Sequence, residues 1–163
     1  MKILISGIVG GLILFVWSFV SWMVLPWHNH TFQTFAHEQS VEAILSVDAP
    51  SAGMYVLKNK PFAFLAVSPQ GYGSMNSKML FAALFDFLSA SLVAYLLLRL
   101  KKTNYFSRLI VVLAFALAVG IQGHVSNWNW WGFSSSFTLV GMADLIIGWF
   151  LAGLVLAKIA SDS

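Results

Sequence analysis

The chain contains no cysteine and very little charge. Of its 163 residues, only 9% are charged, whereas 59% are hydrophobic and 15% are aromatic. A water-soluble domain carries about 25% charged residues, so the composition predicts an integral membrane protein. The absence of cysteine excludes disulfide-forming enzymes, iron–sulfur proteins and enzymes with a thiolate nucleophile.

Other familiar signatures are also missing. The net charge of +3 comes with no basic cluster longer than Lys101-Lys102, so we expect no nucleic-acid partner. The sequence has no G-x-S-x-G, H-E-x-x-H, phosphate-binding loop or dinucleotide fingerprint. We therefore expect no nucleotide cofactor. We also expect no haem, because the apolar runs lack the paired histidines that would bind it on both sides.

Four apolar runs are each long enough for a membrane span, which takes about 20 residues. They cover residues 3–25, 79–100, 109–125 and 137–159. The sequence therefore predicts an all-α membrane protein, a four-transmembrane-helix bundle that forms a single integral membrane domain over residues 1–163. The bilayer is its first expected partner.

The positions of the basic residues predict the orientation. Six of the nine Lys and Arg residues lie at the two ends of the chain or around the connection between the second and third runs: Lys2, Arg99, Lys101, Lys102, Arg108 and Lys158. Basic residues favour the cytoplasmic side, so we expect both termini there, in a multi-pass protein of a bacterial inner membrane.

The connection between the first two runs, residues 26–77, is too long to be a simple turn. Residues 31–47 have the apolar spacing of an amphipathic helix. Two short runs rich in strand-forming residues, 54–57 and 62–67, follow on either side of Lys58-Asn59-Lys60-Pro61. The sequence therefore predicts an outer cap, periplasmic or extracellular, made of a helix and a β-hairpin. Residues 126–136 are expected to form a short outer loop.

Two acidic residues lie inside the apolar runs. A charged side chain in a span costs about 2.5 to 3.5 kcal/mol and usually faces other helices. Asp86 and Asp144 occupy matching depths in the second and fourth runs, with Ser89 and Gln122 on the same outer side. We expect these four residues to form one membrane-embedded polar site. The alternative is that the aspartates only join helices through hydrogen bonds.

The four histidines all fall on the predicted outer side. In an extended chain, His28 and His30 would point the same way, and His124 closes the third run. With a carboxylate these three could hold a metal ion, which is a weak prediction because the pattern is short. The alternative is hydrogen bonding within the cap.

Aromatic and small residues also have positions that predict contacts. Five tryptophans lie near the predicted outer boundary and suit an interfacial anchor or a binding platform: Trp22, Trp27, Trp128, Trp130 and Trp131. Small residues spaced by four predict helix contacts, among them Gly7 with Gly11 and Gly148 with Ala152.

Three functions from different classes follow. The first is a binding or accessory protein that uses an outward-facing polar vestibule (Asp86, Asp144, His28 and His124) and the outer cap to engage a lipid, a small ligand or another membrane or periplasmic protein. The second is a proton- or cation-coupled transport component using Asp86 and Asp144. The third is a metal-binding membrane enzyme. No sequence feature predicts the oligomeric state.

Overall fold

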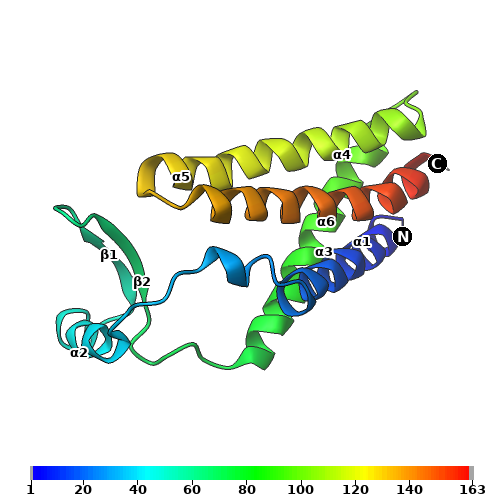
Figure 1. Ribbon diagram of the computed structural model, residues 1–163. Coiled ribbons are helices and arrows are strands. Elements are labelled where there is room, and N and C mark those ends of the chain that lie inside the picture. Colours follow the sequence, from blue (N-terminus) through cyan, green and yellow to red (C-terminus); the bar gives the residue numbers. More distant parts are fainter. Residues whose placement is uncertain (1, 162–163) are drawn as a thin grey trace.

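Four long apolar helical segments dominate the structure (Figure 1), a computed structural model that describes residues 2–161. Each is long and apolar enough to cross a membrane, which confirms the expected multi-pass character. The first comprises α1 (Lys2–Phe19) and a π-helical turn (Val20–Val24), and the second is α3 (Met75–Arg99). The third joins α4 (Tyr105–Gly120), a π-helical turn (Ile121–Val125) and α5 (Ser126–Trp131), and the fourth is α6 (Ser135–Ser161).

The third segment is longer than the sequence predicted. Residues 126–131, expected to belong to an outer loop, continue the helix as α5, because no glycine or proline interrupts them. The helix ends at Gly132, whose φ of 70° is left-handed and suits glycine. Ser134 then caps α6, since its hydroxyl accepts a hydrogen bond from the Phe137 N–H at 3.2 Å.

Helix α1 packs against both α3 and α6, and α6 packs in addition along α4. Although α3 and α4 are consecutive, they pack mainly on α1 and α6 and not along each other. Figure 1 shows α4 and α6 side by side, with α3 crossing at an angle. The start of α1 and the end of α6 lie at the same end of the molecule.

Glycines allow α1 and α3 to approach closely. A Cβ atom placed on Gly11 would lie 2.7 Å from the Cα of Phe87, and one placed on Gly7 would collide with the hydroxyl of Ser91. Close backbone approach through small residues is the usual way in which helices associate in lipid. The predicted Gly7 and Gly11 pair therefore lies at the α1–α3 contact.

Arg108 fastens the connection between α3 and α4. Its side chain is buried and donates hydrogen bonds to three backbone carbonyls, those of Leu97, Leu100 (2.9 Å) and Thr103 (3.4 Å). The last carbonyls of a helix have no partner within the helix. Arg108, in the first turn of α4, thus donates to unpaired carbonyls at the end of α3. The sequence analysis used Arg108 only to predict the orientation in the membrane, which does not indicate this role.

The segment between the first and second helices projects away from the others (Figure 1). It contains a 3₁₀ turn (Asn29–Thr31), α2 (Glu38–Asp48), and the antiparallel strands β1 (Gly53–Leu57) and β2 (Ala63–Val67), which confirm the predicted hairpin. The predicted helix over 31–47 is wrong at its start, because α2 begins only at Glu38. Residues 32–37 are mostly weak helix formers, and all are exposed, so no packing compensates for them.

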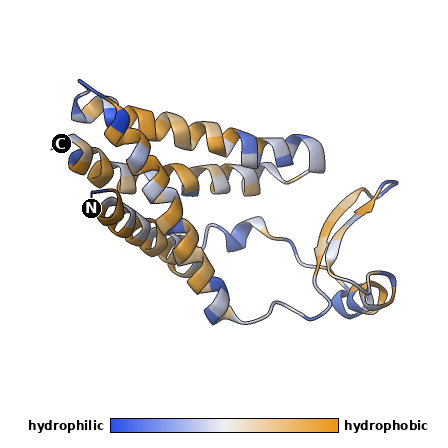
Figure 2. Cartoon of the chain, turned by 180° about the vertical axis from the view of Figure 1, so that it is seen from behind, coloured by the Kyte–Doolittle hydropathy of each residue, from blue (hydrophilic) through white to orange (hydrophobic). Residues whose placement is uncertain are grey.

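Two aromatic contacts connect this segment to the long helices. Phe64 of β2 stacks on Trp131 of α5 with ring centroids 4.3 Å apart, and Phe32 meets Phe137 of α6 edge to face at 5.7 Å. None of the residues of α2 is buried. Figure 2 shows apolar residues along the long helices and also on the hairpin.

Substituting Gly11 with alanine tests the close contact of α1 with α3. We expect Gly11→Ala to lower the free energy of unfolding by about 1 to 3 kcal/mol, because the added methyl group meets backbone and forces the helices apart. Gly123→Ala is the matched control, since its Cβ has no neighbour within 4 Å. Thermal unfolding in mild detergent, followed by circular dichroism, measures both. Equal stability of the two variants would contradict the packing.

Candidate functional site

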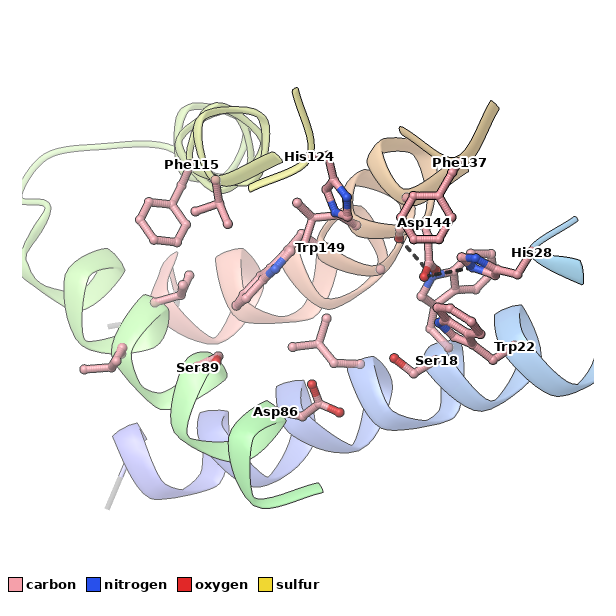
Figure 3. A pocket seen from close by; sticks show the side chains of 18 of the residues that line it. Ser18, Trp22, His28, Asp86, Ser89, Phe115, His124, Phe137, Asp144 and Trp149 are labelled. Carbon is pink, nitrogen blue, oxygen red and sulfur yellow. Dashed lines mark hydrogen bonds and ion pairs between the residues drawn. The ribbon is translucent and has the colours of Figure 1, made fainter. Parts of the chain in front are cut away.

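A cavity of about 520 Å³ lies among the four long helices, at the point where the chain leaving α1 folds back (Figure 3). All four helical segments contribute to its wall. Its polar lining side chains are Ser18, His28, Asp86, Ser89, His124 and Asp144. Both aspartates of the apolar spans and two of the four histidines therefore line one cavity. Their role in binding stays a prediction.

Asp144 of α6 is the best-connected polar group of this cavity. Its Oδ1 accepts a hydrogen bond of 2.7 Å from the indole Nε1 of Trp17, which also lies 3.0 Å from the Asp144 carbonyl oxygen. Its Oδ2 lies 3.2 Å from the Nε2 of His28. Because a carboxylate only accepts, we assign the proton of the His28 ring to Nε2. Both carboxylate oxygens thus have a donor.

Two glycines of α6 make room for the rings around Asp144. A Cβ atom at Gly148 would lie 2.8 Å from the Cδ1 of Trp17, and one at Gly141 would lie 2.7 Å from the ring of His124. These glycines are about one helical turn on either side of Asp144. The small residues around Asp144 therefore accept aromatic side chains from α1 and from the π-helical turn after α4.

His28 is held in place from several sides. Its ring stacks on Trp22 with centroids 3.8 Å apart and planes 9° from parallel, and its Nε2 is also 3.1 Å from the hydroxyl of Ser21. The hydroxyl of Thr31 donates to the His28 carbonyl at 2.7 Å, and Trp27 donates to Ser21. The side chain is 3% exposed. His28 therefore anchors the segment after α1 against the cavity wall.

Both π-helical turns contribute to the cavity wall. Val20–Val24 presents Ser21 and Trp22, and Ile121–Val125 presents His124. A π-helical turn inserts an extra residue into a helix and is frequent at functional sites. Here each turn supplies side chains to the site at the end of a long apolar helix.

Asp86 differs from Asp144 in having no partner. It lies about halfway along α3, and within residues 2–161 no side chain or backbone group donates a hydrogen bond to it or pairs with it. Figure 3 shows its carboxyl group and the Ser18 hydroxyl projecting from facing helices, with Ser89 one turn further along α3. The carboxyl of Asp86 is therefore available to a bound molecule.

Two of the predicted site residues do not join this cavity. Gln122 is exposed on its π-helical turn, and His30 is exposed in the 3₁₀ turn. The extended His28-x-His30 geometry is wrong, because a 3₁₀ turn rotates residues two apart to different sides. Within the described residues 2–161, no three His, Asp or Glu side chains lie close enough together to hold a metal ion.

The five outer tryptophans divide into two groups. Trp128, Trp130 and Trp131 are exposed on α5, whereas Trp22 lines the cavity and Trp27 is tied to Ser21. Their placement at a membrane interface stays a prediction. The sequence analysis missed Trp17, although an indole N–H inside an apolar span needs an acceptor, and the aspartates are the only carboxylates that the spans offer.

The Trp17–Asp144 hydrogen bond can be tested by removing its donor. We expect Trp17→Phe to lower the free energy of unfolding by about 1.5 to 3 kcal/mol, the range for hydrogen bonds to charged groups. Trp128→Phe is the control, because the Trp128 indole also donates, but to the exposed Ser135 hydroxyl. Unfolding in detergent measures both variants.

A double-mutant cycle separates the bond from the loss of ring volume. Asp144→Asn combined with Trp17→Phe should cost less than the sum of the two single changes, since either change alone weakens the same interaction. Strict additivity would show that the Trp17 and Asp144 side chains do not interact.

Comparison with known proteins adds no assignment to this geometry. No protein-family model matches the chain, and neither does any curated protein sequence or any solved structure. The function is therefore inferred from the cavity and the residues that line it.

Proposed function

We propose that this protein acts by binding a small ligand in the cavity between its four long helices, without chemistry of its own. The observation that carries the proposal is the gathering of Asp86, Asp144, His28 and His124 around one cavity within apolar helices. Polar groups are costly in such helices and usually serve a function there. A volume of about 520 Å³ is within the range of about 300 to 1,000 Å³ for small-molecule sites.

The proposal includes the placement of the chain in the membrane. The four helices would cross a bacterial inner membrane as one bundle, with both ends of the chain in the cytoplasm and residues 26–77 outside. Two findings support this placement: the distribution of Lys and Arg, and the position of the start of α1 and the end of α6 at the same end of the molecule (Figure 1). The part of the cavity lined by His28 would then lie toward the outer side.

The outer segment supports an accessory role beside ligand binding. Phe35, Ile44 and Val47 are exposed in and before α2, and Met54 and Leu57 are exposed on β1. Exposed apolar side chains of this density are typical of surfaces that meet a membrane or another protein. In this proposal a partner protein would recognise the outer segment while the cavity holds the ligand.

Proton- or cation-coupled transport is the second candidate. It is favoured by one observation, the carboxyl of Asp86 in an apolar helix, which has no partner among the described residues 2–161. Transport would make flux across a vesicle membrane depend on pH, and this dependence would be lost in both Asp86→Asn and Asp144→Asn. Binding without transport predicts no flux in either the wild type or the variants.

Filling the cavity tests the binding proposal. We expect native mass spectrometry of the protein, purified in mild detergent, to show a retained small molecule that Ser89→Trp expels, because position 89 lines the cavity. Leu88→Trp is the matched control, since Leu88 neighbours Ser89 but is exposed and does not line the cavity.

Substitutions of the two aspartates provide a second test of the binding proposal. Asp86→Asn should reduce the retained molecule while leaving the yield of folded protein unchanged, whereas Asp144→Asn should also lower stability because it weakens the bonds to Trp17 and His28. Equal retention in the wild type and in Ser89→Trp, or equal losses of folded protein in the two Asn variants, would contradict the proposal.

A further inference from the structure

The cavity is open on one side, between α3 and α4. Leu92 and Leu96 of α3 and Phe115 and Val119 of α4 line it, yet all four are between 43% and 67% exposed. Other lining side chains are buried, since Val93 of α3 and Trp149 of α6 are 5% and 7% exposed. Since α3 and α4 hardly pack along each other, their facing side chains leave a lateral opening. In apolar membrane-spanning helices, that opening faces the lipid chains.

The lining changes from polar to apolar toward this opening. Asp86, Ser18 and Ser89 lie at one end, whereas the four side chains at the opening are hydrocarbon or aromatic. A molecule that fits this gradient has a polar head and an apolar remainder. The apolar part of such a molecule can enter from the lipid without leaving an apolar environment.

The charge of the ligand's polar head follows from the cavity side chains whose hydrogen-bonding groups are still free. The carboxylate of Asp144 is satisfied by Trp17 and His28, but within the described residues Asp86 has no donor. The hydroxyl oxygens of Ser18 and Ser89 can accept further hydrogen bonds. An ammonium group offers up to three N–H donors and one positive charge, which matches one carboxylate and two hydroxyl groups.

A phosphate-bearing head does not fit. No Lys or Arg is among the residues that line the cavity in the described part of the chain, so no permanently charged cation there would neutralise a phosphate. The aromatic side chains of Trp22, Trp149 and Phe137 instead suit a cation, because ring faces attract positive charge. This argues for an amine without phosphate and against an ordinary phospholipid.

We propose that the cavity binds a lipophilic amine, which enters from the membrane between α3 and α4 and places its ammonium group at Asp86. This inference rests on the proposed function, because it names the ligand class of the same cavity. The apolar part of the amine lies against Leu92, Leu96 and Phe115 in the lateral opening.

Three probes of equal chain length test the head-group preference. The full-length protein in phosphatidylcholine nanodiscs is titrated with dodecylamine, dodecanol and dodecanoate, and tryptophan fluorescence reports binding because Trp17, Trp22 and Trp149 line the cavity. We expect a saturable change with dodecylamine at a concentration at least tenfold lower than with the other two. Equal responses to dodecylamine and dodecanol, or a preference for dodecanoate, would overturn the inference without any variant.

Two pairs of variants locate the head and the opening. Asp86→Asn should weaken dodecylamine binding at least tenfold, whereas Asp48→Asn removes the same charge at the end of α2 and should change nothing. Leu92→Phe with Val119→Phe narrows the opening and should slow dodecylamine association at least tenfold. Ile110→Phe with Leu139→Phe, at exposed positions outside the cavity, should not. If Asp86→Asn binds dodecylamine as tightly as the wild type, the placement of the ammonium group is wrong. If the narrowed variant associates with dodecylamine as fast as the wild type, the entry route between α3 and α4 is wrong.

The cavity-filling variant separates this inference from the proposed function. If Ser89→Trp expels the retained molecule but dodecylamine has no advantage over dodecanol, the cavity binds ligands and only the assignment of an amine is wrong. If neither the retained molecule nor dodecylamine responds to Ser89→Trp, both proposals fail.

Discussion

The carboxylate of Asp144 connects parts of the chain that are far apart in sequence. Near the start of the last helix, it accepts hydrogen bonds from Trp17 of the first helix and from His28 of the segment that follows that helix. Helices in lipid gain little from burying apolar surface against each other, so directional bonds of this kind define how α1 and α6 are aligned. The same carboxylate determines where the outer segment begins, because His28, which pairs with it, holds that segment against the cavity wall.

The small residues give this arrangement its shape. Gly141 and Gly148 leave space for the rings of His124 and Trp17, and Gly11 brings α1 against the backbone of α3. At the contact of α1 with α3, glycine therefore lets two helices approach closely, whereas around Asp144 glycines accommodate aromatic rings. The result is a tightly packed contact of α1 with α3 and α6, next to an unfilled space between α3 and α4.

The sequence predicted most of the elements but not their orientation about their own axes. Hydropathy located four helices, and two short runs of strand-forming residues located the hairpin, since both depend on local patterns. In a membrane helix the buried and lipid-facing sides are both apolar, so periodicity does not show which side meets another helix. The partner of Trp17, the exposure of Gln122 and the different directions of His28 and His30 therefore needed three-dimensional information. Asp86, Asp144, His28 and His124 could be singled out because polar groups in apolar runs are rare, but their role stays a prediction.

Arg108 has a geometric consequence for the neighbouring helices. By bonding the last carbonyls of α3 from the first turn of α4, it fixes the two helices to each other at one end only. Beyond that point they diverge, because α3 packs on α1 and α4 packs on α6. The width of the opening between Leu92 and Phe115 therefore depends on how each of these two helices lies on its own neighbour.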